Sequence, residues 1–365
     1  MKTYNYKNAL GLLLIVAALS TACDNEVGLL ASIQLETKEN SNKIFVGAAV
    51  NGIVERGGKY HAYSAQIASR STTSGSDWSV LESSVFGEDY YCSGLAATST
   101  TLYAAIRSNQ GSATLKGIYS STDGSSWSAV DPAFASANNI QALYAVSDEV
   151  FAVVMNSSTS YDLVHLNAGS FNQTIISAAD GLITPGAYDS TDYWFAGGTK
   201  LYHGNDFTGT FATVTGVSTP DGKVMTSVAA STTASTIFVS TTDRLVYKLD
   251  VATWTVSSAL SSTSTEKISS LAYLPTSAKV IAGMDTATGY FELDSDVTQS
   301  PVYCTSLSAL APENYSANPL SDKPVVNLSL LGDKLFACVA AGNSKASALW
   351  RNDWTGSTWN GWTAE

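Results

Sequence analysis

The sequence predicts an all-β fold built from seven repeats of four short strands. Charged residues make up only 14% of the 365 residues, while Ser, Thr, Gly and Tyr recur throughout, which is typical of strands joined by tight turns. A short pattern recurs seven times, in which an apolar, usually aromatic residue is followed by a small residue and further apolar character. The spacing of the copies matches the length of four strands with their turns.

The seven copies of this pattern are Tyr60–Tyr63, Leu102–Ala105, Val150–Val153, Trp194–Gly197, Ile237–Ser240, Val280–Gly283 and Leu335–Cys338. Their second positions are separated by 42, 48, 44, 43, 43 and 55 residues. Aromatic side chains fill the wedge-shaped gaps between neighbouring twisted sheets, and small residues fit where strands crowd around a central channel. A β-sandwich gives no reason for the register to return seven times. Residues 44–365 are therefore predicted to form a seven-bladed β-propeller of four-stranded antiparallel blades.

The other strands of each repeat also leave a signal. An apolar strand precedes several copies, at Ser93–Ala97, Ile140–Tyr144, Ile268–Ala272 and Val326–Leu330. A third strand begins with the pairs Ile118–Tyr119, Leu163–Val164, Leu201–Tyr202, Leu245–Val246, Tyr290–Phe291 and Leu349–Trp350. A fourth strand opens at an aromatic residue, at Trp78, Trp127, Phe171, Phe211, Trp254 and Trp359. We expect Trp359–Trp362 to be the outer strand of the seventh blade; the alternative is that Gly28–Leu35 adds a strand to that blade.

One turn between a third and a fourth strand carries a recognisable motif. In Asp123-Gly-Ser-Ser-Trp127 the carboxylate can accept backbone N–H bonds and the glycine permits a positive φ. The stretch Ser121–Trp127 resembles the Asp-box, or bacterial neuraminidase repeat, of sialidases and many non-enzymatic propellers, although it has one residue fewer between its Asp and its aromatic. Degenerate versions recur in other repeats. The resemblance implies that Asp123 is a structural residue at the blade periphery, remote from any active site.

The N-terminal segment predicts export. Lys2 and Lys7 precede the apolar run Ala9–Leu19, which is too short to span a bilayer, and small residues lead to Cys23. This signal peptide, residues 1–22, resembles that of bacterial lipoproteins, with Ser20 in place of the usual Leu. The resemblance implies acylation of Cys23, for example with palmitate, a tether over residues 23–43 and attachment to a membrane of the cell envelope. The alternative is an ordinary secretory peptide cleaved after Ala22.

Composition and residue spacing exclude several functions. The net charge is −12 and the 19 basic residues are scattered, so nucleic acid is not an expected partner. The three histidines, His61, His165 and His203, fall in different repeats without metal-ligand spacing, and we expect neither metal nor cofactor. A sialidase needs an arginine triad, but the five arginines show no such signature. No catalytic residue is assigned.

Two loops are the best candidates for ligand binding, because propellers bind through the loops that join successive blades and through the central channel. They span Phe86–Tyr91 and Thr298–Lys323. The possible ligand contacts in them are Glu88, Asp89, Tyr90, Tyr91, Tyr303 and Tyr315. We expect a monomeric, non-catalytic, lipid-anchored scaffold that binds an envelope protein or a glycan. The alternative is a glycan-active hydrolase or lyase that uses acidic residues on the loop face.

Overall fold

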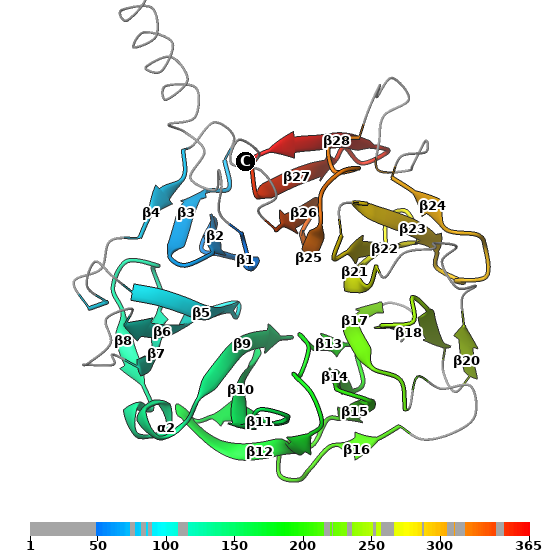
Figure 1. Ribbon diagram of the computed structural model, residues 1–365. Coiled ribbons are helices and arrows are strands. Elements are labelled where there is room, and N and C mark those ends of the chain that lie inside the picture. The colour runs from blue at the N-terminus through cyan, green and yellow to red at the C-terminus, as the bar shows by residue number, and fades with distance from the viewer. Residues whose placement is uncertain are drawn as a thin grey trace, which may run out of the picture. The chain divides into compact units, whose positions relative to one another are not determined.

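The computed structural model describes residues 49–365, apart from 74–76, 82–84, 87–89, 109–115, 215–219, 221, 232–235, 251–252, 257–265, 287, 305–309, 311–317 and 341–346. The predicted signal peptide, Cys23 and tether lie outside the described residues. In the described part of the chain, 28 strands form seven four-stranded antiparallel sheets, each made of four consecutive strands. The sheets are arranged radially around a common axis (Figure 1). The predicted seven-bladed β-propeller is therefore confirmed.

We number the blades I to VII and their strands A to D from the channel outwards. Blades I and II contain β1 (Gly52–Arg56), β2 (Lys59–Tyr63), β3 (Ile67–Ser71), β4 (Ser79–Val80), β5 (Tyr90–Ala97), β6 (Leu102–Ser108), β7 (Lys116–Ser121) and β8 (Ser128–Val130). Blades III and IV contain β9 (Ile140–Val146), β10 (Glu149–Ser157), β11 (Ser160–Asn167), β12 (Ser170–Ala179), β13 (Ala187–Tyr188), β14 (Tyr193–Gly197), β15 (Lys200–Gly204) and β16 (Ala212–Thr213).

Blades V and VI contain β17 (Met225–Ser231), β18 (Thr236–Thr241), β19 (Val246–Asp250), β20 (Thr253–Val256), β21 (Ile268–Leu274), β22 (Lys279–Met284), β23 (Tyr290–Asp294) and β24 (Val302–Tyr303). Blade VII contains β25 (Val325–Leu331), β26 (Lys334–Val339), β27 (Leu349–Trp354) and β28 (Trp359–Ala364). We call the end of the ring where the B–C and D–A connections lie the entry face, and the end with the A–B and C–D turns the exit face.

The recurring sequence pattern forms the B strands, where its small residue is fully buried in every blade. These residues are Ala62, Ala104, Ala152, Ala196, Val239, Ala282 and Ala337. Aromatic residues of the same strands contact the neighbouring blade. The rings of Phe151 and Phe195 meet edge to face with centroids 5.0 Å apart, joining blades III and IV. Pairs of this geometry add about 1 kcal/mol to the burial of their surface. The predicted packing between blades is thus what holds the ring together.

The Asp123 turn joins β7 to β8, as its sequence predicts. One carboxylate oxygen, Oδ1, accepts hydrogen bonds from the backbone N–H groups of Ser125 at 2.7 Å and Ser126 at 2.8 Å. These bonds favour the ionised form and lower the pKa of Asp123. Gly124 has φ 75°, and a Cβ placed there would lie 2.8 Å from Cε1 of His61 on blade I. The turn therefore needs this carboxylate and this glycine for its own geometry.

The ring closes between blades VII and I through side chains. β28 is the outer strand of blade VII, as expected, and the alternative strand at Gly28–Leu35 lies outside the described residues. The carboxylate of Glu365 contacts Arg70 of blade I at 2.6 Å and Arg351 of its own blade at 2.9 Å. It also accepts a hydrogen bond from the indole N–H of Trp78 at 3.2 Å. We call this set the seam cluster.

One short helix was not expected from the sequence. α2 (Pro132–Ala137) links β8 to β9, and Asp131 caps its first turn by accepting the N–H of Phe134 at 3.1 Å. The other carboxylate oxygen of Asp131 accepts the N–H of Phe171 at 2.9 Å, which ties the helix to the outer strand of blade III. No helix within the described ranges is long and apolar enough to cross a membrane. The three cysteines there, Cys92, Cys304 and Cys338, are buried free thiols.

Candidate functional site

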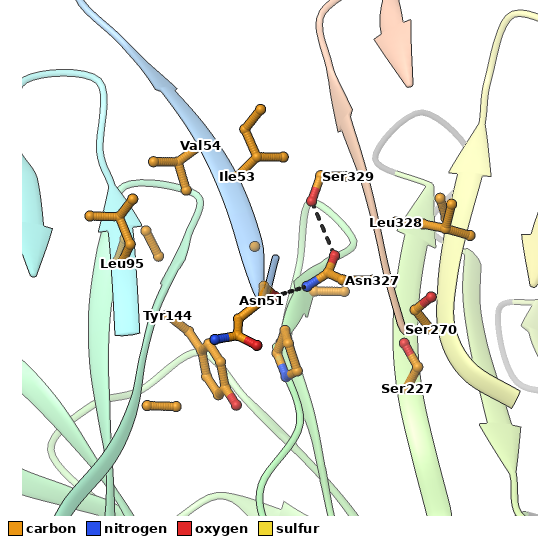
Figure 2. A pocket seen from close by; sticks show the side chains of 18 of the residues that line it. Asn51, Ile53, Val54, Leu95, Tyr144, Ser227, Ser270, Asn327, Leu328 and Ser329 are labelled. Atoms are coloured by element: carbon orange, nitrogen blue, oxygen red, sulfur yellow. Dashed lines mark hydrogen bonds between the residues drawn. The ribbon is translucent and has the colours of Figure 1, made fainter. Parts of the chain in front are cut away.

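The A strands of all seven blades surround a central channel with a volume of about 740 Å³ (Figure 2). This volume lies within the range of pockets that hold ligands. Each blade contributes only a few residues to the lining, because only its innermost strand and the chain next to it reach the axis. The chemistry of the channel is therefore the sum of seven short segments that are far apart in the sequence.

The entry end of the channel is shaped by a repeated β-bulge. Near the start of the A strand, the register with the B strand shifts by one residue in blades II, III, V, VI and VII. The extra residues are Ser93, Gln141, Thr226, Ser269 and Val326. A bulge bends the strand and re-aims its side chains, and such bulges are common beside binding sites. Ser93, Gln141 and Ser269 of this set line the channel, and together with Asn51 and Asn327 they form what we call the polar collar.

Hydrogen bonds from collar positions join neighbouring blades. Ser269 Oγ donates to the carbonyl of Val325 at 2.5 Å, from blade VI to blade VII. Asn327 Nδ2 donates to the carbonyl of Asn51 at 3.1 Å, from blade VII to blade I (Figure 2). Ser329 Oγ in turn donates to Asn327 Oδ1 at 3.2 Å. The entry end of the channel is thus rigidly held and presents amide and hydroxyl groups.

Below the collar, aliphatic residues of the A strands follow, but most of their surface is covered by the neighbouring blades. Leu95, Leu143, Val228, Leu271 and Leu328 are 2–7% exposed, so they pack the blades together and present little surface to the channel. Across the described lining Glu55 is the single carboxylate, and none of these residues is Lys, Arg or His. Glu55 is exposed and lies toward the exit face, near the end of β1. The described channel is therefore close to neutral along its length.

Three tyrosines reach the channel, but other contacts already hold their side chains. Tyr144 donates its hydroxyl proton to the carbonyl of Ile183 at 2.9 Å, and burial raises its pKa. Burial also raises the pKa of Tyr63. The ring of Tyr273 stacks on Phe238 with centroids 5.3 Å apart. The phenols of Tyr63 and Tyr144 therefore stay protonated at neutral pH, and all three rings pack the blades.

The site residues predicted from the sequence have different surroundings in the structure. Glu88, Asp89 and Tyr315 lie outside the described residues. Tyr91 is exposed at the start of β5, whereas Tyr90 beside it is only 4% exposed. The Tyr90 hydroxyl accepts a hydrogen bond from the N–H of Ile67 at 3.0 Å, so this side chain packs blade II against blade I. Tyr303 is partly buried on β24, the outer strand of blade VI, where its ring neighbours Phe291.

The entry face carries most of the exposed large apolar side chains of the described chain. Val85, Leu182 and Val224 lie in D–A connections, and Tyr91 is the second residue of the strand that follows one. The remaining two, Val80 and Val302, lie on the outer strands β4 and β24. We call Val85, Tyr91, Leu182 and Val224 the entry patch. Reasoning from the sequence found only Tyr91 of this set, because isolated aliphatic residues in loops carry no motif.

Comparison with solved structures supports the fold. The chain is similar to YCF48 bound to D1 peptide, with a TM-score of 0.57, 12% identity and coverage of 82% of this chain and 92% of that chain. It is similar to the extracellular domain of BT4673 from B. thetaiotaomicron, with a TM-score of 0.57, 13% identity and coverage of 84% of this chain and 39% of that chain. It is also similar to the computationally designed Ika8 protein, with a TM-score of 0.55, 10% identity and coverage of 89% of this chain and 98% of that chain.

Such low identities show the fold alone. No family model matches the chain, and no curated protein matches it. The class that fold and channel define is a seven-bladed β-propeller with a neutral central channel.

Proposed function

We propose that this protein is a lipid-anchored, non-catalytic binding scaffold that presents its entry face to another protein of the bacterial envelope. The observation that carries the proposal is the entry patch. Four of the six exposed large apolar side chains in the described residues lie in D–A connections or directly after one, and the A–B and C–D turns carry none of the six. Exposed apolar groups gathered on one face are typical of surfaces that bind a partner.

A protein partner fits this patch better than a glycan does. Three of its four side chains are aliphatic, whereas sugar rings bind best against exposed aromatic faces. Two neighbours support the same view. YCF48 was solved with a bound peptide, and the BT4673 neighbour is an extracellular domain, which agrees with export.

The channel chemistry supports a non-catalytic role. Glycoside hydrolysis requires two carboxyl groups about 5 to 10 Å apart in one pocket. The described lining offers Glu55 alone, at the end remote from the collar. The five arginines do not line the described channel either, so the anion-binding triad of a sialidase has no counterpart there.

The binding test uses the full chain in detergent, with labelled envelope proteins and a glycan array as ligands. The double variant Leu182→Ser/Val224→Ser removes half of the entry patch, and Val80→Ser/Val302→Ser is the matched control on outer strands. We expect saturable binding of an envelope protein, at least tenfold weaker for the entry-patch variant and unchanged for the control. Equal binding by both variants, or glycoside turnover without any protein binding, contradicts the proposal.

The anchor is tested separately. Cells that express the wild type or Cys23→Ala are labelled with palmitate, and the purified chains are analysed for incorporated label. We expect label on the wild type alone, and absence of label from both chains removes the lipid anchor from the proposal.

A further inference from the structure

The chain reaches the ring on the entry face. Each A strand runs from the entry face to the exit face, and β1 is the first of them. Asn51, directly before β1, donates from Nδ2 to the carbonyl of Ser64 at 3.4 Å, in the B–C connection of blade I. Ala65 of the same connection accepts the N–H of Cys92, the residue after Tyr91, at 2.8 Å. The N-terminal segment therefore joins the ring beside Tyr91 of the entry patch.

Leu182 and Val224, the two most exposed members of the entry patch, are held next to one another. Thr199, in the B–C turn of blade IV, donates its N–H to Asp180 Oδ1 at 2.9 Å and accepts the N–H of Gly222 at 3.0 Å. The two D–A connections that carry the patch residues are thus bonded to a single turn between them. Because these connections are already ordered, little conformational entropy is lost when a partner covers them.

The entry patch is small for a binding surface. Its four side chains are 39–53% exposed and are distributed over three D–A connections. A small surface binds a partner in free solution only weakly, because the loss of translational and rotational freedom must be overcome first. Efficient recognition by this patch therefore requires that the partner be held at a high local concentration.

The proposed lipid anchor supplies this concentration for one class of partner. Cys23 and Asn51 are 28 residues apart in the sequence, so the chain between them spans roughly 100 Å at most. An anchored ring therefore stays within this distance of its membrane. A second protein held in the same membrane shares the same thin layer, and the two meet at an effective concentration that a partner free in solution does not reach.

The entry face does not favour the lipid surface itself as the ligand. Attraction to anionic lipids requires clustered Lys and Arg side chains without compensating acids. Here Lys223 is paired with Asp243 at 2.6 Å, and Lys323 is paired with Asp322 at 2.6 Å. Tyr91 is the single aromatic member of the entry patch, whereas proteins that insert into the membrane interface do so with several Trp and Tyr side chains.

We infer that the partner of the entry patch is a second protein of the anchoring membrane, which contacts Leu182 and Val224 with an apolar, uncharged surface within reach of the tether. The inference rests on the proposed function and adds the class of the partner and the orientation of the ring, with the entry face turned toward the membrane. The lipid anchor then takes part in recognition, because it sets the concentration at which the patch meets its partner.

Photo-crosslinking in living cells tests the class of the partner. A benzophenone amino acid replaces Leu182 in the full chain, and in a control strain it replaces Thr276, which is exposed in the A–B turn of blade VI on the exit face. Mass spectrometry then identifies the adducts. We expect position 182 to crosslink a protein that is embedded in the same membrane or lipid-anchored to it, and position 276 to give no such adduct. A soluble partner, lipid adducts alone, equal adducts at both positions or no adduct overturns the inference.

An exported form without the anchor separates this inference from the proposed function. In this form an ordinary secretory signal peptide replaces residues 1–22, and Cys23→Ala removes the acylated thiol. At equal amounts of protein we expect the adduct at position 182 to fall at least tenfold. If both forms crosslink the same protein equally, the anchor plays no part in recognition, and the inference fails while the scaffold function stands.

The orientation of the ring is measured on vesicles of phosphatidylethanolamine and phosphatidylglycerol that contain a lipid-bound acceptor dye. A fluorescent amino acid at position 182 or 276 of the anchored chain serves as the donor. We expect stronger energy transfer from position 182, and equal or weaker transfer would overturn the orientation. The form without the anchor should not float with these vesicles; if it floats and Leu182→Ser/Val224→Ser abolishes this, the patch binds lipid and the inference is wrong.

Discussion

Two serines at equivalent positions of neighbouring blades differ in their hydrogen bonds. Ser227 and Ser270 each follow the bulge residue of an A strand. Ser227 Oγ accepts the N–H of Leu271 from the next blade at 3.0 Å, whereas the buried Ser270 Oγ has no partner among the described residues. We expect Ser227→Ala to lower the free energy of unfolding by about 1 to 3 kcal/mol, because it leaves a buried N–H unpaired.

Ser270→Ala is the matched control and should cause no loss, because it removes a hydroxyl that is buried without a partner. Denaturant titration of both variants measures the difference. Equal losses would mean that the Ser227 bond contributes nothing between blades V and VI.

His61 should make stability depend on pH. It is buried against the Asp123 turn, and burial together with the nearby Lys59 lowers its pKa to about 4 from 6.5. Between these two values the unfolded chain binds a proton that the folded chain does not, so stability falls as the pH falls through this range. The full effect is about 3 kcal/mol. Denaturant titrations at pH 7, 5.5 and 4 should show a smaller slope for His61→Gln than for the wild type; parallel slopes would contradict the assignment.

Tyr90 and Tyr91 show what a sequence can and cannot predict about single residues. The sequence predicts both residues as possible ligand contacts in a loop that joins two blades, and the structure places them at the start of β5. Successive side chains of a strand point to opposite sides, and one shift of register exchanges them. Nothing in the local pattern says which of the two is buried. The buried position of Tyr90, where its hydroxyl accepts the N–H of Ile67, was therefore not predictable.

At the level of strands, the approach of blades II and III depends on one glycine. A Cβ at Gly94 would lie 2.4 Å from the backbone nitrogen of Leu143, and a backbone atom cannot move aside as a side chain can. We expect Gly94→Ala to lower the free energy of unfolding by about 2 to 3 kcal/mol through overpacking. Gly209→Ala is the control, since no atom lies within 4 Å of its Cβ position, and it should change stability by less than about 0.5 kcal/mol. If thermal melting gives the two variants the same stability, blades II and III can move apart to accept the added Cβ without losing free energy of unfolding.

The B strands were predictable and several A strands were not. Each B strand is buried on both faces, so its aromatic-small pattern repeats in every blade. The A strand of blade IV, by contrast, has only two residues, because Pro185 and Gly186 precede it and proline donates no ladder hydrogen bond. The A strands of blades II, III, VI and VII each contain a bulge, but the sequence still predicts them from their apolar residues.

At the scale of the whole molecule, the seam cluster decides whether the ring is closed. The side chains of Arg70 and Glu365 are 4% and 7% exposed, and Arg70 lies over the rings of Tyr60 and Trp78. Removing one partner of a buried ion pair costs about 3 to 5 kcal/mol. We expect such a loss for Glu365→Gln in denaturant titration, together with faster proteolysis of blades I and VII.

The exposed pair of Lys223 and Asp243 provides the matched control for this prediction. Its charged atoms are 2.6 Å apart, but both side chains are more than 40% exposed. Asp243→Asn should therefore cost less than about 1 kcal/mol. If Glu365→Gln costs no more than this control, the seam is held by apolar contacts such as the Tyr60–Phe336 pair.

The number of blades was predictable from the sequence, but the channel was not. The repeated B-strand pattern gives the number of blades, because every blade needs the same packing against its neighbours. The channel lining takes three to six residues from each blade, many of them small and without a shared motif, and only the closed ring brings them together. The predicted loop contacts at Glu88, Asp89 and Tyr315 remain predictions.

Because the seam joins residues 287 positions apart, the ring imposes an order on folding. Each blade can form from residues that are close together in the sequence, but the outer face of blade I is covered only when the last residues of the chain are in place. Contacts of such long range are slow to form. Before closure the chain is an open arc with two uncovered blade faces, and a chaperone that shields one of these faces would control how much of the protein closes its own ring instead of joining a second arc.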